Sequence, residues 1–317
     1  MSKLSNLARS VRAFTRELTR IPPAGLSKEK KRPRIGIALG GGFARGLAHI
    51  GVLKVLEENH IPIDFVAGTS VGSVVGAGYC SGVSPKELEE IARMVRFRDF
   101  ARWTLSRLGL ASNDRMVRFL DKFLKVRTFE ELRIPLAVTA TDFATGDAVV
   151  LRSGALVEAV RASCAYPGMF LPVSANGRLL VDGMLAYPVP TVPVRELGAE
   201  RVIAVYLSAH WVNLKGPRHV FDVIGQCFSI AQQRMCEVWQ ASSDLIIQPD
   251  VSGFSYDAFD HAAELIAAGE AAARQTLPIL KQWIAPEEHA TGDKVREHAK
   301  AGKQVLPPAT APAEHSV

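Results

Sequence analysis

The main body of the chain opens with a strand, a glycine-rich turn and a helix, and then repeats that order at once. The first unit reads RIGIAL, GGGFARG and LAHIGVLKVLEENH, and the second reads IPIDFVA, GTS and VGSVVGAGYC. In each unit a short apolar run leads into small residues and then into a segment of helical character. Two consecutive units of this kind predict an α/β fold, with a parallel sheet covered by helices.

The remaining patterns predict one dominant domain over residues 35–284, with its motifs in 35–208 and a helical part in 219–284. The expected strands are RIPLAVTATD, DAVVLRSG, GRLLVDGML and RVIAVYL, the expected helix is GALVEAVRASCA, and YPVPTVPV is proline-rich. Residues 219–248 and 257–284 have helical character. Residues 285–317 are rich in Pro, Ala, Lys and Glu, a composition that predicts a disordered tail.

Residues 84–124 depart from this alternation of strands and helices. They form a predicted helical insertion that starts with the N-cap signal SPKE and mixes seven arginines with methionine, phenylalanine, tryptophan and leucine. One interpretation is an insertion that covers the functional site and presents cationic and apolar faces to a lipid surface. The other is an ordinary pair of surface helices, and the sequence leaves both open.

The basic charge of the chain is concentrated at its start. Residues 1–34 have ten basic and two acidic residues, a net charge of +8, whereas the whole chain has +6 and the remainder therefore −2. The segment KLSNLARSVRAFTRELTRI places apolar residues at helical spacing between the arginines, as in a helix lying on an anionic membrane. A membrane-binding helix, a helix packed on the body of the protein and a solvated leader all fit this pattern, and no nucleic-acid partner is expected.

Cysteine spacing and apolar runs indicate the compartment. The four cysteines lack C-x-x-C spacing, which predicts buried small hydrophobes rather than a zinc site or a disulfide framework. No uninterrupted apolar stretch reaches the roughly 18 residues of a membrane-spanning helix. The start also lacks the apolar region of a secretory signal. We therefore expect a cytoplasmic protein, with peripheral contact at the inner membrane through the leader.

Ser70 stands at the centre of GTSVGS, on the turn between the second predicted strand and its helix. A serine at such a turn lies at a helix N-terminus, where backbone N–H groups favour developing negative charge. Gly68 and Gly72 flank it because side chains at these positions would crowd the turn. Ser70 is therefore a candidate nucleophile, and the alternative is a serine that only caps the following helix.

A serine nucleophile needs a base to take its proton. None of the eight histidines lies in a context typical of a Ser-His-Asp triad, although His210 and His219 stay open. Asp182 is the better candidate because it ends the apolar run of LLVDGML and immediately precedes Gly183. If the strands carrying Ser70 and Asp182 are neighbours, their C-terminal ends meet in one crevice and a Ser-Asp dyad can form. The alternative role of Asp182 is an Asx cap of its turn.

GGGFARG supplies what such a dyad would still lack. Gly40, Gly41 and Gly42 leave backbone N–H groups open at the mouth of a helix, a natural site for an oxyanion or a phosphate. Arg45 adds a positive charge in the first turn of that helix, which suits an anion ligand or a structural ion pair. A dinucleotide site is disfavoured, because Arg45 replaces the last glycine of G-x-G-x-x-G and Asp64 begins its strand instead of ending it.

Four motifs, GGGFARGLAHIGVL, GTSVGS, ASCAYPGMFLPV and LLVDGM, occur in this order between residues 33 and 208. With them the chain resembles the patatin-like phospholipase family, particularly its compact bacterial branch. The resemblance implies a three-layer α/β/α sandwich with a central, mostly parallel sheet and hydrolysis of acyl esters by a Ser-Asp dyad. It implies that Ser70 is the nucleophile and Asp182 the base. The further family positions are the oxyanion loop at Gly40, Gly41 and Gly42, the motif arginine Arg45, and the motif glycines Gly46, Gly68, Gly72 and Gly183.

Two residues depart from the family pattern. Met184 follows Asp182-Gly183 where the family has a small residue, so we expect a narrowed or reshaped pocket. Phe43 stands where a small residue is common and is expected to affect how substrate reaches the loop. Neither departure removes a catalytic atom.

The sequence therefore predicts a serine hydrolase of phospholipids, lysophospholipids or other fatty acyl esters, which needs no metal or cofactor. Two alternatives stay open. One is an acyltransferase on the same dyad, in which an alcohol takes the acyl group in place of water. The other is a lipid-binding regulatory protein that keeps the pocket without turnover. An intact nucleophile, base and glycine loop favour the hydrolase.

Overall fold

The computed structural model describes residues 32–104, 106–207 and 220–285, without the side chains of residues 220 and 221. The chain divides into two units, Met1–Ile284 and Ala285–Val317, and every helix and strand given below belongs to the first. The predicted leader helix, the predicted tail, and the two histidines His210 and His219 lie outside the described residues. Of the helices that the structure describes, none is both long and apolar enough to cross a membrane.

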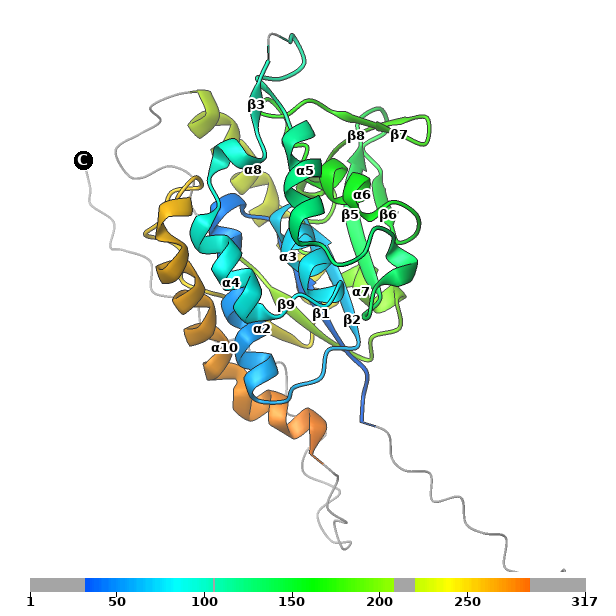
Figure 1. Ribbon diagram of the computed structural model, residues 1–317. Helices are drawn as coiled ribbons and strands as arrows, with labels where there is room; N and C mark the ends of the chain where they lie inside the picture. Colours follow the sequence, from blue (N-terminus) through cyan, green and yellow to red (C-terminus); the bar gives the residue numbers. More distant parts are fainter. Residues whose placement is uncertain (1–31, 105, 208–219, 286–317) are drawn as a thin grey trace, which may run out of the picture. The chain divides into compact units, whose positions relative to one another are not determined.

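Within the described residues, eight strands form the central sheet: β1 (Ile35–Leu39), β2 (Phe65–Thr69), β5 (Leu136–Asp142), β6 (Ala148–Leu151), β7 (Val173–Ala175), β8 (Arg178–Asp182), β9 (Arg201–Val205) and β10 (Leu245–Ile247). Their order is β10-β9-β1-β2-β5-β8-β7, with β6 paired to β5 (Figure 1). β1, β2, β5, β9 and β10 are parallel, whereas β6, β7 and β8 add antiparallel pairs at one side. The expected mostly parallel sheet is thus confirmed.

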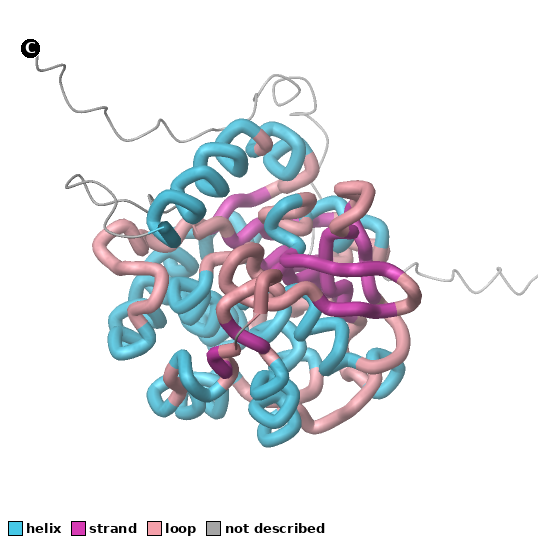
Figure 2. Tube along the Cα trace, turned by 90° about the horizontal axis from the view of Figure 1, so that it is seen from above, coloured by secondary structure: helices cyan, strands magenta, loops and turns pink. Residues whose placement is uncertain are grey.

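Helices cover both faces of the sheet (Figure 2). They are α2 (Ala48–Glu58), α3 (Val71–Cys80), α4 (Pro85–Met94), α5 (Asp114–Phe123), α6 (Leu156–Ser163), α7 (Thr191–Glu196), α8 (Val220–Arg234), α9 (Cys236–Ala241) and α10 (Ala262–Ile284). In β1, Ile37 and Leu39 join the larger apolar core with α2, α3 and α10, while Ala38 joins a smaller core with α7 and α9. Strand residues alternate between faces, so a strand buried on both faces reads as an unbroken apolar run. The three-layer α/β/α sandwich is confirmed.

Two strands meet end to end along one edge of β5. β6 pairs with residues 138–141 of β5, β2 pairs up to Thr139, and β8 pairs from Ala140 onward. Each strand residue has two edges, and β6 takes one of them at all four positions, so β2 and β8 share the other. β2 runs parallel to β5 and β8 antiparallel, so their C-terminal ends face each other. They are not the side-by-side neighbours on which the proposed crevice depended, yet this arrangement also brings Ser70 and Asp182 together.

The insertion at residues 84–124 consists of α4, a short hairpin and α5. Ser84 and Glu87 form the capping box that starts α4, as SPKE predicts. The hairpin pairs β3 (Arg102–Trp103) with β4 (Ala111–Ser112), and a 3-10 turn, η2 (Phe97–Asp99), precedes it. In Figure 1 the β3 region projects beyond α4 and α5.

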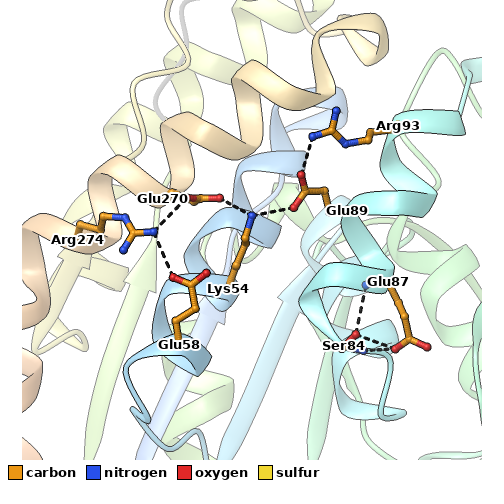
Figure 3. A network of polar contacts seen from close by, with 8 residues as sticks. All are labelled: Lys54, Glu58, Ser84, Glu87, Glu89, Arg93, Glu270 and Arg274. Carbon is orange, nitrogen blue, oxygen red and sulfur yellow. Dashed lines mark hydrogen bonds and ion pairs between the residues drawn. The ribbon is translucent and has the colours of Figure 1, made fainter.

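Ion pairs hold α4 against the neighbouring helices α2 and α10 (Figure 3). Lys54 of α2 lies between Glu89 of α4 and Glu270 of α10, with its Nζ at 2.9 Å from each carboxylate. Arg274 joins Glu270 to Glu58 at 3.2 Å on the other side. Lys54 is about one third exposed, so each pair is worth little alone, but the shared partners order the three helices together. The network fixes the place of α4, which forms a wall of the site described below.

Two segments differ from the sequence-based expectation. α7 begins within the proline-rich YPVPTVPV, which Pro193 permits because it lies in the first turn, where backbone N–H groups have no intrahelical partner. β10 falls within the stretch 219–248 that was expected to be helical, and its three residues pair with β9. A strand of three residues is too short to give a recognisable sequence pattern, and it forms because it pairs with β9.

The four cysteines are free thiols. Cys80 and Cys164 are buried as expected, whereas Cys227 is exposed and Cys236 half-buried. The expectation is wrong for the latter two because the helix face on which a cysteine falls decides its burial. For α8 and α9 the sequence pattern did not define that face.

Candidate active site

Ser70 occupies a sharp turn between β2, which ends at Thr69, and α3, which begins at Val71. Its φ of 53° and ψ of −125° lie outside the regions that L-residues favour. Such a conformation costs roughly 1–3 kcal/mol, so contacts with the surrounding structure must stabilise it. The Ser70 N–H donates to Ser163 Oγ at 2.8 Å, and the Ser70 carbonyl accepts from Ser73 at the start of α3. The turn therefore fixes the serine side chain by its backbone, as in the strand–helix elbow of serine hydrolases.

Asp182 lies at the end of β8, directly opposite that turn. Ser70 Oγ donates to Asp182 Oδ2 at 2.8 Å, and the Met184 N–H donates to Asp182 Oδ1 at 2.9 Å. The carboxylate is fully buried, and this burial raises its pKa to about 7, although the two hydrogen bonds act to lower it. A carboxylate with a pKa near neutrality can both take and return a proton. Asp182 thus caps its turn and accepts the hydrogen bond of Ser70.

The motif glycines permit the close approach of the strands and the turn. A Cβ at Gly72 would collide with the Leu39 carbonyl of β1, and one at Gly183 would collide with the Thr139 carbonyl of β5. At Gly68 it would meet the backbone of the following helix, and at Gly46 the side chain of Val71. The glycines therefore permit close packing around Ser70 and Asp182.

The glycine loop between β1 and the 3-10 turn η1 (Phe43–Leu47) uses its three amides differently from the expectation. The Gly40 N–H donates to the Val205 carbonyl and the Gly41 N–H to the Pro188 carbonyl, both at 3.1 Å. Within the described residues the Gly42 N–H has no acceptor. The idea that all three amides are open is therefore corrected, because carbonyls from β9 and from the loop before α7 take two of them.

His49 is a residue of this site that the sequence reasoning set aside as part of a helix. It is fully buried in α2, and its Nε2 lies 2.7 Å from the Gly40 carbonyl. A carbonyl only accepts, so Nε2 carries the proton and Nδ1, which has no partner among the described residues, does not. Burial lowers the pKa of His49 to about 4, so the ring stays neutral. Its spacing of nine residues from Gly40 was the available signal.

We expect His49→Phe to lower the free energy of unfolding by about 1–3 kcal/mol at pH 7, because the Gly40 carbonyl loses its donor. The unfolded chain takes up a proton near the ordinary pKa of 6.5, whereas folded His49 does so only near 4. Native stability therefore falls through this window as the pH drops, by up to about 3 kcal/mol from this residue. The phenylalanine variant lacks that loss. Urea unfolding should therefore show that the native chain is more stable than the variant at pH 7, and that this difference in free energy of unfolding becomes smaller or changes sign at pH 4.5. A difference that is the same at both pH values would contradict this role.

Arg45 lies beneath the glycine loop and does not line the cavity next to Ser70. It is 4% exposed, and its Nε donates to the Phe254 carbonyl at 2.8 Å. Burial lowers its pKa to about 10, against the attraction of Asp257. These contacts favour the structural role over the anion ligand, because the guanidinium joins η1 to the segment before α10.

An apolar cavity of about 100 Å³ opens next to Ser70. Apart from Ser70 and Cys164, every residue that lines it is apolar. One wall comes from α2 and α3, and the opposite wall from the insertion, with Leu88, Ile91 and Val95 of α4 and Phe119 and Phe123 of α5. The insertion thus lines the site, as one part of the first interpretation expects, whereas contact of its faces with a lipid surface stays a prediction.

The two departures from the family pattern have different outcomes. Phe43 lines the cavity, with its ring edge-on to Tyr166 at 4.9 Å and to Tyr256 at 5.9 Å between centroids. Met184 is buried against Gly41 and is not among the residues that line the cavity. Met184 therefore does not narrow the cavity directly, because its side chain packs on the glycine loop, and a reshaping of the site through that loop stays a prediction.

The structure is thus an α/β protein in which a strand-end serine is hydrogen-bonded to a buried carboxylate beside an apolar cavity. The family model for patatin-like phospholipases matches residues 37–195, half of the chain. The chain belongs to the patatin-like phospholipase family.

Individual relatives agree with this assignment. An uncharacterised NTE family protein of Mycobacterium tuberculosis is 35% identical over 222 residues, which cover 63% of this chain and 61% of that protein. The lysophospholipase NTE1 of Cryptococcus neoformans is 33% identical over 227 residues, 68% of this chain and 14% of the fungal protein. The crystal structure of VipD from Legionella pneumophila matches 78% of this chain and 67% of that chain with a TM-score of 0.55 and 13% identity, which supports the fold alone. The chain spans about three fifths of the mycobacterial relative and about one seventh of the fungal one.

Proposed function

We propose that the chain is a serine hydrolase of fatty acyl esters, among them phospholipids and lysophospholipids, with Ser70 as nucleophile and Asp182 as base. The observation that carries the proposal is the 2.8 Å hydrogen bond from Ser70 Oγ to Asp182 Oδ2 at an apolar cavity. Family membership and the lysophospholipase name of a relative support the substrate class. A hydroxyl bonded to a buried base, beside a space for an apolar chain, is what acyl transfer from a lipid ester requires.

The first half of the reaction forms an acyl-enzyme. Ionised Asp182 takes the proton of Ser70 Oγ as Oγ attacks the ester carbonyl carbon, and the carbonyl oxygen becomes an oxyanion. The Gly42 N–H is the amide of the glycine loop that is available to this oxygen, and one such donor is worth roughly 3 kcal/mol in the transition state. The carbon–oxygen bond to the alcohol then breaks, and the alcohol leaves with the proton held by Asp182.

The second half reverses these roles with water. Asp182 takes a proton from a water molecule that attacks the acyl carbon, and Ser70 Oγ leaves as the fatty acid is released and regains its proton from Asp182. Burial places the pKa of Asp182 at about 7, so the carboxyl can shuttle one proton in both directions near neutral pH. An alcohol in place of this water would make the same site an acyltransferase, and analysis of the products separates the two.

The substrate class is tested by narrowing the cavity. Ala92 of α4 is buried and lines the cavity, so Ala92→Leu adds volume in the space proposed for the acyl chain. We expect kcat/KM for a 16-carbon 4-nitrophenyl ester to fall about tenfold or more, since overpacking an apolar site costs about 1–3 kcal/mol. The rate for the 4-carbon ester should change little.

A matched control is Ala272→Leu, at a half-buried position of α10 that does not line the cavity. It should leave the ratio of the two rates at the native value. Equal loss for both esters in Ala92→Leu, or the same change of ratio in both variants, would show that the cavity does not hold the acyl chain.

A further inference from the structure

The insertion carries a second surface, on the outer side of the helices that wall the cavity. A hollow of about 650 Å³ lies there between α4 and α5. Four cations line it, Arg98, Arg115, Arg118 and Lys122, together with the exposed Met94. We call this feature the cationic hollow.

The cations of the hollow are largely uncompensated. Within the described residues, Arg98, Arg118 and Lys122 form no ion pair, and Arg115 donates to the carbonyls of Arg98 and Ala101 at 3.1 Å and 3.4 Å. Asp99 is the acidic residue of the lining, and its Oδ2 accepts from the backbone N–H of Arg96 at 2.8 Å. The hollow therefore carries an excess of positive charge, four cations against one carboxylate.

The same stretch concentrates charge along the chain. Residues 93–122 have eight basic and three acidic residues, a net charge of +5. The whole chain has +6, so subtracting this +5 and the +8 of residues 1–34 leaves −7 for all other residues. Such an asymmetry orients the folded part in front of a negatively charged surface.

Apolar side chains stand exposed beside these cations. Trp103 is 70% exposed and Leu108 68%, both on the β3 hairpin, and Met94 is 71% exposed at the end of α4. With Leu110 they make four of the ten large hydrophobic residues that are exposed in the described part of the chain. Exposed tryptophan next to lysine and arginine is typical of surfaces that lie at the interface of a lipid bilayer.

Position ties this surface to the site. Ile91, Val95, Phe119 and Phe123 line both the cationic hollow and the cavity next to Ser70, so the two spaces adjoin and share these apolar side chains. We propose that the insertion is a docking surface for a bilayer rich in anionic phospholipids, with the cations of the hollow on lipid phosphates and Trp103, Leu108 and Met94 in the interface. Docking would place the cavity next to the bilayer that contains the lipid. The inference does not rest on hydrolysis, and Ser70→Ala should bind vesicles like the native chain.

The insertion of Trp103 is tested by a local signal that the leader cannot produce. Brominated phosphatidylcholine quenches a tryptophan that enters the bilayer, and residues 1–34 contain no tryptophan. With vesicles of brominated phosphatidylcholine and phosphatidylglycerol we expect native emission to be quenched, and Trp103→Phe to lose most of that quenching. Phe143→Ala, at a 63% exposed aromatic position outside the insertion, should be quenched like the native chain. Equal quenching in the presence and absence of Trp103 would overturn the proposal.

The role of the cations is tested by neutralising three of them. In the full chain, Arg98→Gln, Arg118→Gln and Lys122→Gln together should weaken partition into the same vesicles about tenfold or more, since each basic residue near an anionic surface contributes a factor of about five. The control combines Arg133→Gln, Arg234→Gln and Lys281→Gln, which remove three exposed cations outside the insertion. Both variants should unfold at the native temperature. Equal partition of the two triple variants, or binding that phosphatidylglycerol does not strengthen, would overturn the proposal.

Discussion

Replacing Asp182 by Asn should lower kcat/KM for a fatty acyl ester by about three orders of magnitude or more, and at the same time stabilise the fold at alkaline pH. The amide has nearly the shape of the carboxyl group and can still accept from the Met184 N–H that now bonds to Asp182 Oδ1. It cannot take the proton of Ser70 Oγ. The loss of rate therefore reports on the base and not on a collapse of the site.

The gain in stability follows from the raised pKa of Asp182. In the folded chain this pKa is about 7, and the ordinary value of the unfolded chain is 3.8, so the folded state holds the proton more tightly. The stability that the protonated carboxyl contributes is fully present below pH 3.8 and is lost as the pH rises through 7. At pH 9 the buried charge costs on the order of 4 kcal/mol, which asparagine removes.

Thermal or urea unfolding at pH 5 and pH 9, with kcat/KM beside it, measures both effects. Asp142→Asn is the matched control, because Asp142 is also buried at a strand end but bonds to Ala144 and not to Ser70. It should keep the native rate. A stability gain for Asp182→Asn that is equal at both pH values, or an active Asp182→Asn enzyme, would contradict the assignment of Asp182 as the base.

Ser70→Ala should abolish turnover, with a loss of about 10⁴-fold or more, because it removes the hydroxyl that is proposed to attack the ester carbonyl. The double variant Ser70→Ala, Asp182→Asn should be no slower than Ser70→Ala alone. Two residues that act through one hydrogen bond in one step have effects that do not add. The residual rates of the three variants, measured on one ester, give the interaction directly.

Ser81→Ala is the matched control for the nucleophile. Ser81 is a buried serine at the other end of α3, and its Oγ donates to the Gly78 carbonyl. The Ser81→Ala variant should have a somewhat lower free energy of unfolding and keep a kcat/KM close to the native value. Additive losses in the double variant would mean that Ser70 and Asp182 act independently, and a Ser70→Ala variant with native activity would exclude Ser70 as the nucleophile.

Much of the fold and the main pair of the site could be predicted from local sequence. An apolar run followed by small residues and a helical pattern fixes a strand-end turn, and that is why Ser70 and Asp182 were identified as candidates. The direction of β8 could not be predicted, because an apolar strand reads the same in a parallel and in an antiparallel pair. The end-to-end meeting of β2 and β8 on β5 is therefore a finding of the structure.

The parts of the site that the sequence did not predict depend on distant partners. The amides of Gly40 and Gly41 are taken by the carbonyls of Val205 and Pro188, more than 140 residues further along the chain. His49 donates to the Gly40 carbonyl because α2 packs against the glycine loop. The inward apolar face and the outward cationic face of the insertion separate only when α4 and α5 fold against α2 and α3.

The most direct measurement of the central claim is the reaction of the native chain with a fluorophosphonate, followed by mass spectrometry of its peptides. Attack of an activated serine forms an Oγ–P bond and releases fluoride. The account predicts a single adduct on Ser70 in the native chain and slow or absent labelling in Asp182→Asn. A folded native chain that stays unlabelled, or an adduct on another residue, would contradict it.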